Sequence, residues 1–191
     1  MTQALESRNP SQRILNAAFD YISKNGYANV SLRDIATEAG VVLSQLHYYF
    51  KNKEGLLVAV IQMVTKRTLA EVENAIQSGV NAKERYNALV GYFQELLDER
   101  PRVFRVLVDL SSMALWSQTF AVMLNSLFDG LAELIEKYIV VLVPQEAAFH
   151  AYSPKTVARM LFGAVFGASF QAVLNEDQHL PDALIAVKTM L

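Results

Sequence analysis

The chain contains no cysteine, and this absence excludes disulfide bonds, thiol nucleophiles and metal sites built on thiolates. Its three histidines stand at positions 47, 150 and 179, too far apart in sequence for a metal-binding motif, and no glycine-rich phosphate loop is present. We therefore expect no metal, no cofactor and no enzymatic activity. The sequence leaves open only a catalytic triad assembled in space.

Strong charge of one sign is also missing, since the net charge is −2. With 52% apolar and 19% charged residues, the 191-residue chain is not of the disordered class and is long enough for one large or two small domains. Residues 1–53 nevertheless hold six bases against four acids, whereas the rest holds eleven against fifteen. This contrast is a modest indication of a polyanion-binding N-terminal module.

Long apolar segments are few. The N-terminus lacks the apolar core of a secretory signal. The uncharged run 110–128 carries seven hydroxyl or amide side chains, and the run 160–175 holds two glycines. We interpret both runs as buried helices and expect a cytoplasmic protein without a membrane partner.

Strand signals are nearly absent, and apolar residues recur with a helical period along most of the chain. This pattern predicts an all-α protein of about nine helices. After residue 50, helices are expected over residues 54–77, 85–99, from 101 onward, 117–143, 154–176 and 181–191.

The first 50 residues are predicted to form three short helices. Gly26 ends the first, Ser31 caps the second, and Gly40 makes a tight turn into a third helix at about 42–50. This is the outline of a helix-turn-helix, with the motif at about 31–50. Its expected core consists of Ile14, Ala18, Ile22, Leu32, Ile35, Ala36, Val41, Leu46 and Phe50.

The third helix has two different faces. Leu46 and Phe50 lie one turn apart and share the inward face. The outward face carries groups that can donate to phosphates or read base edges in a major groove, which are the side chains of Ser44, His47, Tyr48 and Lys51, with Gln45 on its shoulder. The helical wheel alone equally allows an ordinary solvated face.

A longer pattern decides between these two interpretations. Its segments, in order, are Arg13-Ile14-Leu15, Asn25-Gly26-Tyr27, Asp34-Ile35-Ala36, Ala39-Gly40-Val41, Tyr48-Tyr49-Phe50 and Lys51-Asn52-Lys53-Glu54-Gly55-Leu56-Leu57. Over about residues 10–60, this pattern resembles the N-terminal domain of the TetR family of one-component repressors. The resemblance implies a homodimer in which each subunit offers one helix-turn-helix to a palindromic DNA operator.

The resemblance also implies two domains. A three-helix DNA-binding domain would cover residues 8–68, and a larger helical domain for ligand binding and dimerisation would cover residues 69–191. Carried over by position, the expected DNA-contacting residues are Ser31, Arg33, Leu43, Ser44, Gln45, His47, Tyr48, Tyr49 and Lys53.

Three positions depart from the family pattern. Val42 stands where a capping residue is frequent, Leu43 where a basic or polar reader is frequent, and His47 where tyrosine is frequent. Leu43 can offer only an apolar contact, for example to a thymine methyl, and Gln45 is the best candidate for adenine. We expect these departures to change the operator sequence and to leave the docking mode unchanged.

The middle helices are rich in large apolar side chains, which typically line pockets for apolar ligands. The candidate effector-binding residues are Phe93, Phe104, Leu107, Met113, Trp116, Phe120, Met123, Phe166, Phe170 and Gln171. Taken singly, each of these side chains is better explained as part of the core. We expect a small, mostly apolar effector, although Arg102, Arg105 and Arg159 leave room for an anionic group.

Small residues recur one helical turn apart in the segment 160–175, which would allow close helix packing between two subunits. The candidate interface residues are Gly163, Gly167, Ala168 and Ala172. Packing within one subunit is the alternative.

Together these features predict a ligand-responsive transcriptional repressor that is released from its operator by the effector. The helix over residues 54–77 is expected to couple the two domains. The alternatives are a carrier of hydrophobic ligands and a small-molecule enzyme with an all-helical pocket.

Overall fold

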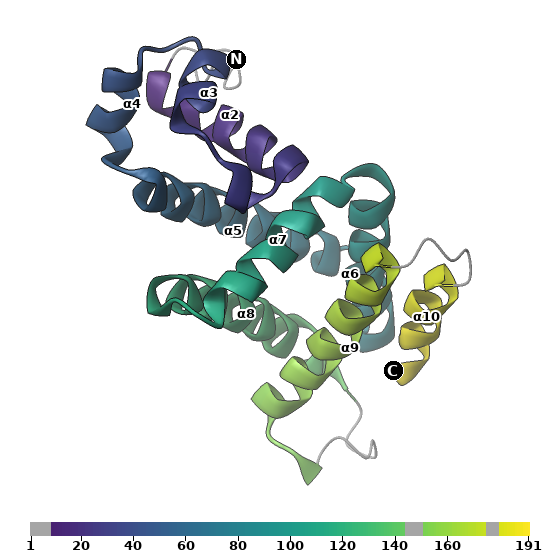
Figure 1. The fold of residues 1–191 in the computed structure, drawn as a ribbon. Coiled ribbons are helices and arrows are strands. Elements are labelled where there is room, and N and C mark those ends of the chain that lie inside the picture. Colours follow the sequence, from purple (N-terminus) through teal and green to yellow (C-terminus); the bar gives the residue numbers. More distant parts are fainter. Residues whose placement is uncertain (1–8, 144–150, 175–179) are drawn as a thin grey trace. The chain divides into compact units, whose positions relative to one another are not determined.

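The computed structural model describes residues 9–143, 151–174 and 180–191 (Figure 1). Over these residues the chain has nine α-helices and no strand, which confirms the all-α prediction. The helices and short 3-10 segments are α2 (Pro10–Asn25), η1 (Tyr27–Asn29), α3 (Leu32–Glu38), α4 (Leu43–Phe50), α5 (Lys53–Gln77), α6 (Ala82–Glu99), α7 (Pro101–Ala114), α8 (Gln118–Tyr138), η2 (Val140–Leu142), α9 (Pro154–Leu174), α10 (Leu180–Val187) and η4 (Lys188–Met190).

The predicted signals at the first helix ends are present. Gly26 and Gly40 have φ angles of +73° and +62°, a region that glycine enters without a steric penalty. The Ser31 hydroxyl accepts a hydrogen bond from the Asp34 amide at 3.3 Å. These three residues fix where α2 ends, where α3 begins and where the chain turns into α4.

Three helix boundaries differ from the sequence prediction. Helix α10 ends at Val187, four residues early, and the 3-10 segment η4 follows it. Helix α6 begins three residues earlier than expected, because the Asn81 side chain caps it by accepting from the Glu84 amide at 2.9 Å. Helix α8 ends at Tyr138, five residues early, where Ile139, Val140 and Val141 begin a stretch of β-branched residues that disfavour the α conformation. The predicted end of α9 near residue 176 lies outside the described residues, as do His150 and His179.

The chain forms two compact units. The first consists of residues 1–66 and 105–123, and the second of residues 67–104 and 124–191. Helices α5, α7 and α8 therefore each contribute residues to both units. The functional boundary expected between residues 68 and 69 stays a prediction.

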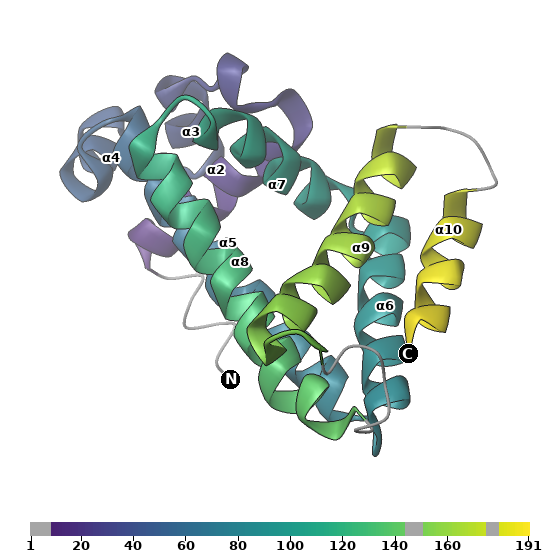
Figure 2. The same ribbon diagram turned by 90° about the horizontal axis from the view of Figure 1, so that it is seen from below.

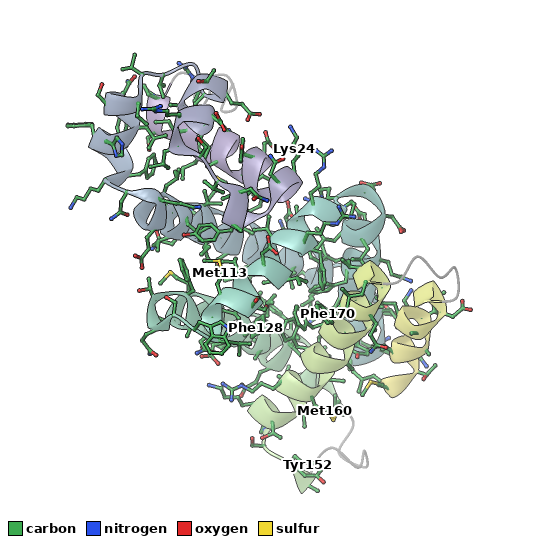
Figure 3. All side chains as sticks on the ribbon, viewed as in Figure 1. Lys24, Met113, Phe128, Tyr152, Met160 and Phe170 are labelled. Carbon is green, nitrogen blue, oxygen red and sulfur yellow. The ribbon has the colours of Figure 1, made fainter. Side chains whose placement is uncertain are left out.

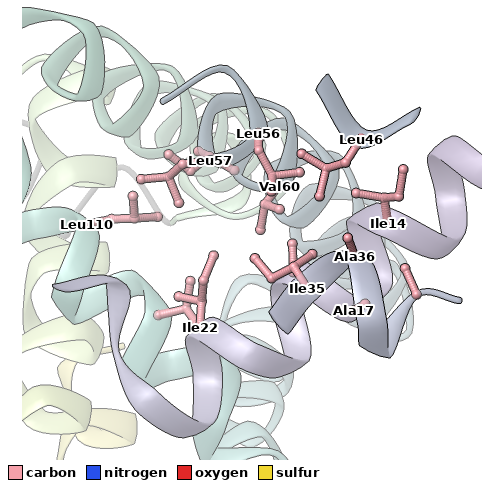
Figure 4. Packing of buried hydrophobic residues seen from close by; sticks show 14 of the residues in the cluster. Ile14, Ala17, Ile22, Ile35, Ala36, Leu46, Leu56, Leu57, Val60 and Leu110 are labelled. Atoms are coloured by element: carbon pink, nitrogen blue, oxygen red, sulfur yellow. The ribbon is translucent and has the colours of Figure 1, made fainter. Parts of the chain in front are cut away.

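The first unit has one hydrophobic core (Figure 4). Side chains from α2, α3, α4 and α5 point into it, with Leu110 of α7 at its edge. Six of the nine expected core residues are buried, namely Ile14, Ala18, Ile22, Ile35, Ala36 and Leu46, and the other three pack against the core while partly exposed, namely Leu32, Val41 and Phe50. This core seats α3 and α4 on α2.

In the second unit, α6, α9 and α10 contact one another and run as neighbours (Figure 2). The buried Tyr86 of α6 donates its hydroxyl to the Leu161 carbonyl of α9 at 3.4 Å. Burial raises the pKa of Tyr86 above the usual range of a phenol, so the side chain stays a neutral donor. This bond fixes the contact between α6 and α9.

Helix α9 is unusually apolar for its degree of burial. Among the described helices it alone has the length and composition of a membrane-spanning helix, with 21 residues and a mean hydropathy of 1.6 over 18 of them. Only 39% of that stretch is buried within the chain. Figure 3 labels Met160, one of its exposed apolar side chains. A substantial apolar surface of α9 is therefore left uncovered by the residues that the structure describes.

Candidate nucleic-acid interface

The turn between α3 and α4 is held by an arginine from α2. The Arg13 guanidinium donates to the Ala39 carbonyl through Nε at 3.0 Å and to the Gly40 carbonyl at 2.7 Å. These carbonyls belong to the end of α3, which has no further helical amides to satisfy them. Sequence reasoning cited Arg13 only as part of the family pattern, because a contact across 26 residues leaves no local signal.

The faces of α4 are as the helical wheel predicts. Leu46 is fully buried and Phe50 partly buried, whereas Ser44 and His47 are exposed. Tyr48 is 81% exposed, and its ring lies edge-on to that of Tyr49, with 5.3 Å between the centroids. An exposed ring of this size at the centre of a polar helix face is available to a partner.

Three expected contact residues are less free than the sequence suggested. Leu43 is half-buried against the core of the first unit, and Gln45 is partly buried. Val42, which is not itself an expected contact, is the N-cap residue of α4, and its side chain makes no hydrogen bond to the first amides of that helix. The Ser31 hydroxyl is engaged in capping α3, whereas Arg33 on the same helix is exposed.

The end of α4 is a tight turn centred on Lys51. Lys51 has φ +59° and ψ −57°, and the Asn52 amide donates to the Phe50 carbonyl at 2.6 Å across it, which is the pattern of a γ-turn. The His47 ring nitrogen Nδ1 lies 2.9 Å from the Lys51 carbonyl. A positive φ in a residue with a side chain is costly and tends to occur at functional sites.

Lys53, the first residue of α5, packs against η1. Its ammonium lies 4.5 Å from the centroid of the Tyr27 ring and 3.5 Å from the Ala28 carbonyl. Burial, and secondarily the Glu54 carboxylate, raises the pKa of Tyr27, so the ring stays a neutral cation–π acceptor. Lys51 and Lys53 thus place two cations just after the outward face of α4.

The ten candidate effector residues are divided between the two units. In the first unit, Met113, Phe120 and Met123 pack in the core, Leu107 is partly buried, and Trp116 is 89% exposed. In the second unit, Phe93, Phe104 and Phe166 are buried or partly buried, Phe170 is partly buried, and Gln171 is exposed. Figure 3 labels Met113 and Phe170, one from each unit.

The rings of the second unit form a continuous aromatic cluster, which we define as Phe93, Phe104, Phe128, Phe162 and Phe166. Phe128 contacts Phe162 and Phe166 with centroid distances of 5.4 and 5.5 Å. Phe104 lies 5.5 Å from Phe166, and Phe93 lies 6.3 Å from Phe162. The cluster joins α6, α7, α8 and α9 within that unit.

Two clefts of about 400 and 390 Å³ are described in the second unit, and none of the ten candidates lines them. The larger lies at the end of α8 and the start of α9, beside the exposed Tyr152 (Figure 3). The other lies between α5 and α8, beside Glu73 and Lys137. Among the described residues, no group of three or more metal-ligating side chains is present.

The two glycines of α9 do not pack closely against any other part of the chain that the structure describes. A Cβ atom added at Gly163 or Gly167 would meet no other described atom within 4 Å. Ala168, in contrast, is 8% exposed, and Ala172 is partly buried. Close packing within the subunit therefore explains Ala168 but not the two glycines.

Comparison with known proteins finds a family match for the N-terminal helices of the first unit. The family model for bacterial regulatory proteins of the tetR family matches residues 14–60, from α2 into α5. The fatty acid metabolism regulator protein of Bacillus subtilis (strain 168) is 29% identical over 92 residues, which are 48% of this chain and 47% of that protein. The transcriptional repressor KstR of Mycolicibacterium smegmatis is 32% identical over 94 residues, 49% of this chain and 46% of that protein.

The match thus spans about half the length of these curated relatives, which are named as regulators and not as enzymes. The fold is shared over nearly the whole chain. A TetR-family transcriptional regulator from Agrobacterium tumefaciens superimposes with a TM-score of 0.80 at 19% identity, covering 96% of this chain and 99% of that one. Residues 14–60 thus match the TetR family of bacterial regulatory proteins, and the chain as a whole shares the fold of a solved structure named for that family.

Proposed function

We propose that this protein is a cytoplasmic, ligand-responsive transcriptional repressor that binds a palindromic duplex operator as a homodimer and is released by a small, mostly apolar effector. The observation that carries the proposal is the outward face of α4. That face presents Ser44, His47 and Tyr48 to solvent while Leu46 anchors the helix in the core. The relatives named as regulators and repressors support the same assignment.

The docking mode follows from the two ends of α4. The exposed side chains of its first two turns enter the major groove, where Gln45 and its neighbours read base edges. Arg33, Lys51 and Lys53 then contact the phosphates on either side, which supplies affinity without sequence preference.

We propose that a second copy of the chain packs against the exposed apolar surface of α9. Its apolar surface is largely unburied, and Gly163 and Gly167 leave room for another helix to approach. Dimerisation through α9 and α10 would also supply the second reading helix that a palindromic operator needs. The half-sites of such operators lie about one DNA turn apart, roughly 34–36 Å.

The effector is proposed to bind beside the aromatic cluster of the second unit. Five phenylalanine rings without a charged group among them favour an apolar ligand. Arg159, which could have attracted an anion, is instead paired with Asp129 at 2.6 Å. Helix α5 runs unbroken from Lys53 to Gln77 and would transmit binding to the DNA-reading helices. A coupling of about 1–3 kcal/mol changes operator affinity by roughly 5- to 150-fold.

A selection experiment tests the proposal directly. The full-length protein is used to enrich duplexes from a randomised pool at physiological salt, and the enriched sequences are compared. We expect a palindrome with two half-sites centred about one turn apart, bound at least about 10³-fold better than a scrambled duplex. Enrichment of no common sequence would overturn the proposal, whereas an enriched single half-site would remove only the homodimer.

A further inference from the structure

The imidazole of His47 is held by the turn that follows its own helix. Its Nδ1 lies 2.9 Å from the Lys51 carbonyl oxygen, and its backbone carbonyl accepts from the Lys51 amide, also at 2.9 Å. Lys51 is therefore bound to His47 through both of its peptide groups. Since Lys51 sits in a γ-turn with positive φ, its carbonyl points back along α4 instead of continuing a helix.

The Lys51 carbonyl selects the tautomer of the neutral His47 ring. A carbonyl oxygen can only accept, so the His47–Lys51 bond requires N–H at Nδ1. The neutral imidazole has one N–H, which leaves Nε2 with a free lone pair. Nε2 lies across the ring from the bonded nitrogen, on a side chain that is exposed on the outward face of α4. The ring thus offers an acceptor to whatever that face meets.

We propose that His47 is a specificity-determining residue that reads an amino-bearing base edge, N6 of adenine or N4 of cytosine, by accepting a hydrogen bond at Nε2. The proposal rests on the proposed function, because it assumes that α4 enters the major groove. In that groove only adenine and cytosine present a donor, whereas guanine and thymine present acceptors.

The same bond argues against a phosphate contact. Phosphate oxygens only accept hydrogen bonds, and the single N–H of the neutral ring is already used by Lys51. Contact with a phosphate would need a second proton on the ring. The adjacent side chains of Lys51 and Lys53 already supply cations for that purpose. A clamped acceptor loses little side-chain freedom on binding, which favours a discriminating contact.

The test uses an operator enriched from the randomised pool and two variants. Each adenine in the half-sites is replaced in turn by the purine nucleoside that lacks the N6 amine, and each cytosine by the pyrimidinone nucleoside that lacks the N4 amine. Affinity is measured for the wild type, for His47→Leu, which has no acceptor, and for His47→Gln, which keeps one. Because the base analogues also weaken base pairing, the leucine variant serves as the matched reference for every duplex.

We expect one amine per half-site whose removal weakens wild-type binding by about five- to tenfold and leaves His47→Leu binding unchanged. The glutamine variant should keep part of that dependence. Equal losses for wild type and His47→Leu at every position would overturn the proposal. So would a fall of about one in the salt slope of His47→Leu, because that would reveal a phosphate contact. Absence of any enriched operator would instead overturn the proposed function, and this inference with it.

Discussion

The Lys53 ammonium lies over the face of the Tyr27 ring, 4.5 Å from its centroid. Tyr27 in turn meets Phe120 of α8 edge-on, with 6.3 Å between the centroids. All three residues belong to the first unit. The side chain that we expect to contact a phosphate is thus directed by a ring that is itself fixed by packing, which lowers the entropic cost of the contact.

Replacing Lys53 with alanine is expected to weaken binding to all duplexes alike and to lower the slope of log affinity against log salt by about one. The measurement is a salt titration of fluorescence anisotropy with the enriched operator and with a scrambled duplex. Lys24→Ala is the matched control, because Lys24 is an exposed lysine of the same unit that lies 4.0 Å from Glu38. A Lys53→Ala slope equal to that of the control would remove the phosphate role.

Loss of the Arg13 guanidinium is expected to destabilise the turn before α4. Arg13→Ala should lower the free energy of unfolding by about 1.5–3 kcal/mol, because the carbonyls of Ala39 and Gly40 lose a charged donor. Urea unfolding followed by circular dichroism measures this change. Arg33→Ala, at an exposed arginine of α3, should stay within about 0.5 kcal/mol of wild type. Equal stability of the two variants would contradict the capping role.

Stability is expected to depend on pH through Glu71 in the second unit. Although burial alone would raise the pKa of Glu71, hydrogen bonds from Arg100, Arg67 and Tyr92 outweigh it and hold the pKa at about 2 instead of 4.5. Because the folded-state pKa is lowered, the stabilisation is present above pH 4.5 and is lost as the pH falls towards 2. We expect a contribution of about 1 kcal/mol to the free energy of unfolding, since Glu71 and its hydrogen-bond partners are partly exposed and therefore screened by solvent.

Urea unfolding at pH 7 and pH 3 of wild type and Glu71→Gln measures this contribution. Glutamine keeps the size of the side chain and removes its charge, so the variant should lose less stability than wild type over that interval. A wild type and a variant that lose the same amount of stability between the two pH values would show that Glu71 is not responsible.

Gly163→Arg is expected to produce a folded monomer. The added side chain has room within the subunit, because no described atom lies within 4 Å of its Cβ position, but it would obstruct an approaching second helix. Light scattering of dilute protein gives the oligomeric state, and circular dichroism checks the fold. Gly91→Arg on α6 is the control, since an added Cβ there also meets no described atom within 4 Å. A Gly163→Arg protein that stays dimeric would place the interface elsewhere.

The local elements could be predicted from the sequence because their signals are local. Gly26, Ser31 and Gly40 mark helix ends through their own backbone preferences, and the spacing of Leu46 and Phe50 identifies the inward face of α4. The α8 boundary was missed because the apolar pattern continues past Tyr138. Only the accumulation of β-branched residues distinguishes that continuation from more helix.

The contacts between distant segments could not be predicted in the same way. Nothing near Arg13 in sequence indicates that it reaches Ala39, and nothing near Lys53 indicates that it covers Tyr27. The apolar residues of the middle helices illustrate the same limit. From composition alone, Trp116 and Phe104 are both expected to line a pocket or fill the core. In the structure, Trp116 is exposed and Phe104 is buried. Burial depends on how the helices pack, which single-residue patterns do not encode.

The most direct test of the account is the effect of the outward α4 side chains on sequence discrimination. Anisotropy titrations compare wild type with a variant in which Ser44, Gln45, His47 and Tyr48 are all replaced by alanine, each against the enriched operator and a scrambled duplex. We predict that the wild type prefers the operator by at least about 10³-fold and that the variant binds both duplexes with the wild type's scrambled-duplex affinity. A folded variant that still discriminates between the two duplexes would contradict the reading role of α4.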